Sequence, residues 1–73
     1  MKNKSMRFKD DAEVQPGAFV VFNDLPDATV YEVTERKGVA VWVKQQGTDY
    51  APQRSDVSLC LKPTAQQLRG WGL

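Results

Sequence analysis

The chain has 73 residues and a formal net charge of +1, with one cysteine and no histidine. A chain of this length forms one domain with a modest core. A single cysteine excludes an internal disulfide. The lack of histidine excludes Ser-His and Cys-His nucleophilic schemes and leaves no His/Cys cluster for zinc.

The N-terminal residues are basic, but no apolar core follows them, so we expect no signal peptide. No apolar run approaches the length of a membrane span, and we expect no membrane partner. The unpaired cysteine favours a reducing compartment. These features predict a cytoplasmic protein.

Charge is distributed in blocks along the chain. Residues 1–9 carry four positive charges and no negative ones, residues 10–35 carry seven negative and no positive ones, and residues 36–73 carry six positive against two negative. Two interpretations follow: the blocks meet in the fold and pair locally, or the molecule has one acidic and one basic face that orients a partner.

The first 13 residues form a polar arm, which we expect to be flexible, with disorder at its start and Phe8 as its anchor. Residues 14–73 form the single domain. Pro16-Gly17 opens a strand over residues 18–22, which is apolar on both faces. Such a strand is either covered on both sides or leaves one face to a partner. Residues 23–27 have the composition of a turn.

Residues 29–44 predict a β-hairpin, because β-branched and aromatic residues alternate with polar ones on both sides of Glu35-Arg36-Lys37-Gly38. We expect a type I turn closed by a left-handed Gly38. The residues expected to face inward are Tyr31, Val33, Val39, Val41 and Val43.

Residues 45–53 are polar and are where any fifth strand would lie. Residues 56–61 predict a strand with Val57, Leu59 and Leu61 in the core, and Cys60 is expected to pack as a small apolar residue. Thr64 and Gln67 have the spacing of a capping box, which predicts a short helix that ends at Gly70 and Gly72. Leu68 and Trp71 would share one face of it.

Several of these features resemble the SH3-like barrels, the group that includes Tudor and KOW modules. They are Pro16-Gly17 before Val20 and Phe22, then Val30-Tyr31-x-Val33, then Gly38-Val39-x-Val41-x-Val43, and a closing strand near residues 55–61. The resemblance covers about residues 14–62. It implies a mainly β fold: a small antiparallel SH3-like barrel or strongly bent sheet of four to five strands, with a short C-terminal helix. It implies a fold more than a function.

We expect no enzyme. The carboxylates lie in polar segments without the pattern of an acid/base pair, no spacing matches a calcium loop, and no glycine-rich loop could cradle phosphate. We therefore predict no catalytic residue, no metal site, no cofactor and no small-molecule substrate.

Two kinds of binding remain open. In the first, the chain is a non-catalytic adaptor that binds a protein partner or itself. An apolar patch outside the barrel, made by Phe19, Val21, Trp42 and Trp71, would provide the surface unless the C-terminal helix covers it. Modules of this size and mixed charge are often accessory proteins of compact genomes such as phages or plasmids.

In the second, the chain binds nucleic acid. Arg36 and Lys37 would lie at the hairpin tip, and Lys44 and Arg54 would neutralise phosphates beside the stacking side chains of Trp42 and Tyr50. The nearly neutral net charge counts against this alternative. An aromatic cage for methylated side chains would need Tyr31 as well, and its expected inward direction argues against one.

Overall fold

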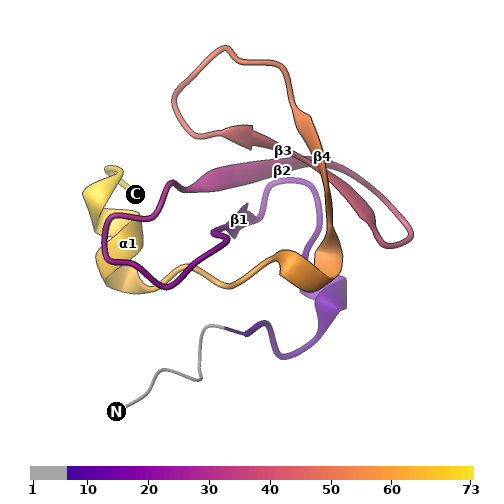
Figure 1. The fold of residues 1–73 in the computed structure, drawn as a ribbon, viewed down its shortest axis with the longest axis horizontal. Helices are drawn as coiled ribbons and strands as arrows, with labels where there is room; N and C mark the ends of the chain where they lie inside the picture. The colour runs from indigo at the N-terminus through magenta and orange to yellow at the C-terminus, as the bar shows by residue number, and fades with distance from the viewer. Residues whose placement is uncertain (1–6) are drawn as a thin grey trace.

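The computed structural model describes residues 7–73. Its elements, in chain order, are the 3-10 helix η2 (Asp11–Glu13), the strands β1 (Phe19–Val20), β2 (Tyr31–Lys37), β3 (Ala40–Gln45) and β4 (Gln53–Asp56), the 3-10 helix η3 (Val57–Leu59) and the helix α1 (Ala65–Gly70), as Figure 1 shows. None of the helices in this part of the chain has the length and apolar character that crossing a bilayer requires.

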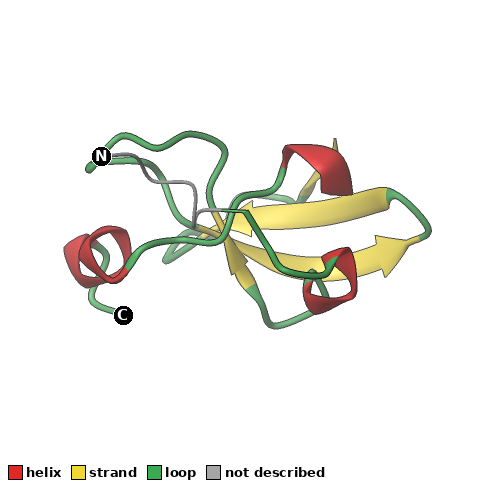
Figure 2. Cartoon of the chain, turned by 90° about the horizontal axis from the view of Figure 1, so that it is seen from below, coloured by secondary structure: helices red, strands yellow, loops and turns green. Residues whose placement is uncertain are grey.

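The four strands form one antiparallel sheet in the order β1-β2-β3-β4. The sheet curls into a half-barrel with α1 at one end (Figures 1 and 2). An isolated bridge between Val21 and Leu61 ties the chain after η3 to the end of β1, so the curl is partly closed. The predicted fold class is confirmed, although the described residues between Gln45 and Gln53 form no fifth strand.

The predicted hairpin is formed by β2 and β3, but its turn is tighter than expected. β2 runs to Lys37, and only Gly38 and Val39 connect it to Ala40. Gly38 has φ +61, as a two-residue hairpin turn with glycine first requires. The inward direction predicted for Val39 is wrong, because its place at the tip leaves it 63% exposed.

A β-bulge at Thr34 changes the alternation of β2. Val33 pairs with Val43, but the next pair is Glu35 with Trp42, so Thr34 is an extra residue. Beyond the bulge, Glu35 therefore lies on the outer face of the sheet with Trp42. Arg36 lies opposite Val41, on the inner face.

The predicted strand over residues 56–61 is wrong. β4 ends at Asp56, whose side chain accepts a hydrogen bond from the Ser58 backbone N–H (2.9 Å) and begins η3. A 3-10 helix repeats every three residues, so Val57 and Cys60 are buried together. Leu59, predicted in the core, is 60% exposed.

The core has two parts, one on each face of the sheet. The inner cluster lies inside the curl and comprises Val14, Val20, Val33, Val41, Val43, Val57 and Cys60. The outer cluster comprises Val21, Ala28 and Val30, with Phe19, Leu61, Leu68 and Trp71 packed against it. Val20 packs in the inner cluster, and Phe19 and Val21 pack in the outer one, so this part of the predicted strand is covered on both sides. Phe22, the last residue of the predicted strand, is only partly buried.

Helix α1 covers the β1 end of the outer face. The predicted capping box is present: Thr64 and Gln67 bond each other's backbone N–H groups at 3.0 and 3.1 Å. The buried Gln67 side chain also donates to the Leu25 carbonyl (2.8 Å), and the Trp71 indole N–H donates to the Ala28 carbonyl (3.0 Å). These bonds hold the helix against the loop that precedes β2.

Candidate functional site

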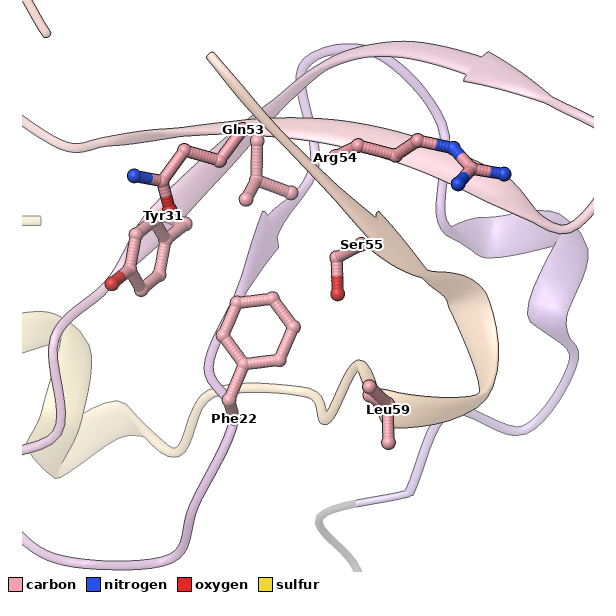
Figure 3. A pocket seen from close by; sticks show the side chains of 7 residues that line it. Phe22, Tyr31, Gln53, Arg54, Ser55 and Leu59 are labelled. Atoms are coloured by element: carbon pink, nitrogen blue, oxygen red, sulfur yellow. The ribbon is translucent and has the colours of Figure 1, made fainter. Parts of the chain in front are cut away.

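An open cleft of about 330 Å³ lies on the inner side of the half-barrel (Figure 3). Its lining comes from four separate parts of the chain: Phe22 after β1, Tyr31 in β2, Val43 in β3, and Gln53, Arg54, Ser55 and Leu59 in β4 and η3. The cleft is therefore a product of the curl, since no single segment contains it.

The cleft occupies the seam where the barrel is not closed. β4 is the last strand of the sheet, and on its far side it faces Phe22 and Leu59 instead of another strand. In Figure 3 the side chains of Phe22 and Ser55 point into this space, and Leu59 lies at its lower border. The seam leaves apolar side chains in contact with solvent, Leu59 most of all.

Two aromatic rings form one wall of the cleft. Phe22 and Tyr31 meet edge to face, with ring centroids 5.3 Å apart and an interplanar angle of 64°. Both rings also pack against the inner cluster. Edge-to-face packing is a favourable aromatic geometry, so the two rings hold each other in place.

The free edge of β4 adds backbone groups to the other wall. The Val57 N–H donates to the Val39 carbonyl (2.8 Å). Because hydrogen-bonded pairs alternate in an antiparallel ladder, the N–H and C=O of Arg54 point away from β3, toward the seam. The Arg54 side chain extends away from the cleft, as Figure 3 shows.

A smaller cavity of about 50 Å³ adjoins the cleft. It shares Tyr31, Val43 and Gln53 with the cleft, and it adds Gln45, Ala51 and the predicted site residue Tyr50. Tyr50 is 68% exposed. Because they share these lining residues, the cleft and the smaller cavity are neighbours, and together they are called the groove.

The side chains of the groove are of kinds that bind ligands through apolar contacts and hydrogen bonds. Its polar side chains are amides, a hydroxyl, two phenols and one guanidinium that points away. Within residues 7–73, no group of three or more His, Cys, Asp or Glu side chains could hold a metal ion. The arrangement can accept apolar groups and hydrogen-bond an amide backbone.

Four of the predicted partner-binding residues do not form the expected patch. Phe19, Val21 and Trp71 belong to the outer cluster under α1, and Val21 is fully buried. Trp42 belongs to neither buried cluster. It lies half-buried on the outer face between Glu35 and Arg54, beyond the part that α1 covers.

The basic residues predicted at the hairpin tip have different roles. Arg36 donates from Nε to the Gly38 carbonyl (2.8 Å) and from Nη1 to the Asp11 and Val14 carbonyls, which ties η2 to the hairpin. Only Lys37 projects into solvent. The sequence predicts Arg36 at the hairpin tip beside Lys37, but the bulge at Thr34 turns its side chain to the inner face.

Charges of both signs alternate on the outer face of the sheet. Glu32 lies opposite Lys44, and Glu35 and Arg54 lie on either side of Trp42. Asp56 lies two residues beyond Arg54 on the same strand. The acidic and basic blocks of the sequence are therefore interleaved by the strand pairing, and they do not make two opposite faces of the sheet.

Cys60 borders a third cavity, of about 270 Å³, between η3 and the arm that carries Phe8. Burial, and to a smaller extent the charge of Asp56, raises the pKa of the Cys60 thiol. A thiol with a raised pKa is a poor nucleophile. As predicted, Cys60 packs as a small buried residue.

The sequence interpretation missed Phe22, Gln53, Ser55 and Leu59 as site residues. The sequence pattern places Phe22 in a strand and predicts Leu59 in the core. The pattern that would have identified Leu59 is Asp56 followed by Ser58, which is the local capping chemistry of a turn. The expected flexibility of residues 1–13 concerns in part residues 1–6, which lie outside the described residues.

Comparison with protein-family models, with curated proteins and with solved structures finds no match to this chain.

Proposed function

We propose that this chain is a non-catalytic protein-interaction module that binds an extended segment of a partner protein in the open cleft. The observation that carries the proposal is the aromatic pair Phe22–Tyr31 facing exposed Leu59 beside the free edge of β4. We also assign the half-barrel to the SH3-like architecture, on the strand pattern that resembles it.

The size and lining of the cleft support a peptide ligand. Its volume is at the lower end of the roughly 300–1,000 Å³ of ligand pockets, enough for one large apolar side chain. The Arg54 N–H and C=O at the sheet edge offer a place for the backbone of that segment, as in strand addition. The edge is short and is preceded by Pro52, which limits pairing to a few residues.

The same geometry favours protein over nucleic acid. Arg54, the one basic side chain at the cleft, points away from it. The Arg36 guanidinium already donates hydrogen bonds to backbone carbonyls. On the outer face, three acidic residues accompany three basic ones: Glu32, Glu35 and Asp56 with Lys37, Lys44 and Arg54. A nucleic-acid surface needs a net excess of positive charge.

The proposal of a non-catalytic role is supported by the chemistry of the cleft. Ser55 supplies a hydroxyl, but the chain has no histidine to act as its base. The cleft lining contains no carboxylate. The aromatic, amide and hydroxyl groups of the cleft are suited to binding a ligand.

The test is a selection from a displayed library of random extended peptides, followed by titration calorimetry. We expect the selected peptides to contain a large apolar residue. We also expect Leu59→Asp to lower their affinity about tenfold or more, because the charge replaces an apolar contact in the interface. Leu25→Asp is the matched control, because Leu25 is similarly exposed (55%) but lies outside the cleft.

Two results would contradict the proposal. One is a selection that yields no peptide whose binding Leu59→Asp weakens. The other is a set of selected peptides whose affinity falls equally in Leu25→Asp and Leu59→Asp, since the cleft would then not be their site.

A further inference from the structure

The outer face of β2, β3 and β4 has a charge pattern that the cleft does not explain. Strand pairing places Glu35, Trp42 and Arg54 in one row across the three strands. The neighbouring row, toward the hairpin turn, is Lys37, Ala40 and Asp56. Each row thus has a charge on β2 and the opposite charge on β4.

Within residues 7–73, no element packs over this region of the face. α1 packs on the outer cluster at the β1 end, and Trp42 is not part of that cluster. Figure 2 shows α1 at the end of the molecule away from the β2–β3 turn. Glu35, Lys37 and Arg54 are exposed, and Trp42 is half-buried among them.

From this pattern we infer that the Trp42 face binds the same face of a second copy of the chain, about a two-fold axis parallel to β3. Such an axis places β2 of each copy over β4 of the other and keeps the rows in register. Glu35 then faces Arg54 of the second copy, and Lys37 faces its Asp56. Trp42 meets its own counterpart on the axis, as in a self-complementary two-fold interface.

A two-fold axis perpendicular to the strands would place β2 over β2 and β4 over β4. If that axis passed through the Trp42 row, Glu35 would face Glu35 and Arg54 would face Arg54, and like charges that meet across an interface are costly. If it passed between the two rows, opposite charges would meet, but Trp42 would lie over Ala40. The parallel axis both pairs opposite charges and brings the two Trp42 side chains together.

The face is small, so the association is weak and depends on concentration. A standard interface covers about 800 Å² on each partner, which would be about a sixth of the 4817 Å² of accessible surface here. Three short strands of a curled sheet offer less than that. We expect association at submillimolar protein concentration, weakened by added salt because its ion pairs lie near solvent.

The test is sedimentation equilibrium with charge-reversal variants. Glu35→Arg and Arg54→Glu should each weaken self-association at least tenfold, because each places like charges in contact. A mixture of the two single variants should form a heterodimer, since every facing pair is again of opposite charge. The double variant E35R/R54E should self-associate as the unchanged chain does.

Two matched variants serve as controls. Asp24→Arg reverses an exposed charge in the loop before β2 and should leave self-association unchanged. Leu59→Asp alters the cleft on the inner side and should also leave it unchanged, so this inference and the proposed function can fail independently. Circular dichroism checks that each variant is folded.

The inference is overturned if the chain sediments as a monomer at every concentration. It is also overturned if either single variant self-associates as the unchanged chain does, or if the mixture of folded single variants does not associate.

Discussion

Each end of the outer sheet face carries one tryptophan, and the two tryptophans differ in how they pack. At the β1 end, Trp71 packs against Val21, Ala28 and Val30, and its indole N–H donates to a backbone carbonyl. At the other end, Trp42 lies among charged side chains and outside both buried clusters. One tryptophan completes the fold, whereas the other stays half-buried at the surface.

The comparison shows that aromatic content does not locate a binding surface by itself. A helix of six residues is enough to bury one end of the face, because Gln67 and Trp71 bond the backbone beneath it. The helix is too short to reach the other end. The packing of this last short element therefore decides which tryptophan is covered.

The largest expected effect is at Trp71. Trp71→Ala should lower the free energy of unfolding by about 3 kcal/mol, since a large apolar contact is lost and the Ala28 carbonyl loses its donor. A domain this small has about 3–5 kcal/mol in total, so much of the chain should be unfolded. Urea unfolding measures this loss in the free energy of unfolding.

Trp42→Ala is the comparison for that variant and should cost well under half as much. Equal losses at the two positions would mean that both ends of the face are parts of the folded core, which would remove the distinction between them. Trp71→Phe, which keeps most of the packing, should fall between the two.

A smaller effect is expected at Gln67. Gln67→Ala should cost about 1–3 kcal/mol, because the Thr64 N–H and the Leu25 carbonyl both lose a buried partner. Thermal unfolding is the measurement. Gln66→Ala, an exposed position on the same helix, is the control and should change stability little. Similar losses in the two variants would show that the buried bonds do not hold the helix.

The smallest expected effect is a loss of stability at low pH, and it comes from Asp56 on β4. The hydrogen bond from the Ser58 backbone, then that from its side chain and the charge of Arg54, hold the pKa of the Asp56 carboxyl below its ordinary value of 3.8. A lowered folded-state pKa means that Asp56 stabilises the fold above its unfolded-state pKa. This contribution is lost as the pH falls through the folded-state pKa.

Asp56→Asn keeps a capping acceptor but does not titrate, so its stability should fall less between neutral pH and strong acid. Unfolding curves across that range measure the difference, with Asp49→Asn as the control. An unchanged acid dependence in Asp56→Asn would show that the η3 cap does not contribute.

Much of the fold could be predicted from short-range patterns. The alternation of Val41 and Val43 predicted their strand and their burial, because a half-buried strand repeats every two residues. Thr64 and Gln67 predicted a helix start that needs only three residues of spacing. The small size and free state of Cys60 were enough to predict its packing.

The cleft could not be predicted in this way. Its walls come from residues up to 37 positions apart, Phe22 to Leu59, which only the curl of the sheet brings together. Leu59 continued an apparent strand pattern, and the capping bond from Ser58 to Asp56 overrode it. Local alternation cannot reveal a change of period that a cap imposes.

The sequence by itself determined the hairpin, the capped helix and the mainly β class, because each depends on contacts between near neighbours in the chain. The tertiary structure alone decided which tryptophan is covered, where the barrel stays open and which way Arg36 points. The bulge at Thr34 illustrates the reason. It is defined by the register between two strands, and it moves Arg36 to the inner face, where it binds the backbone of residues 11 and 14.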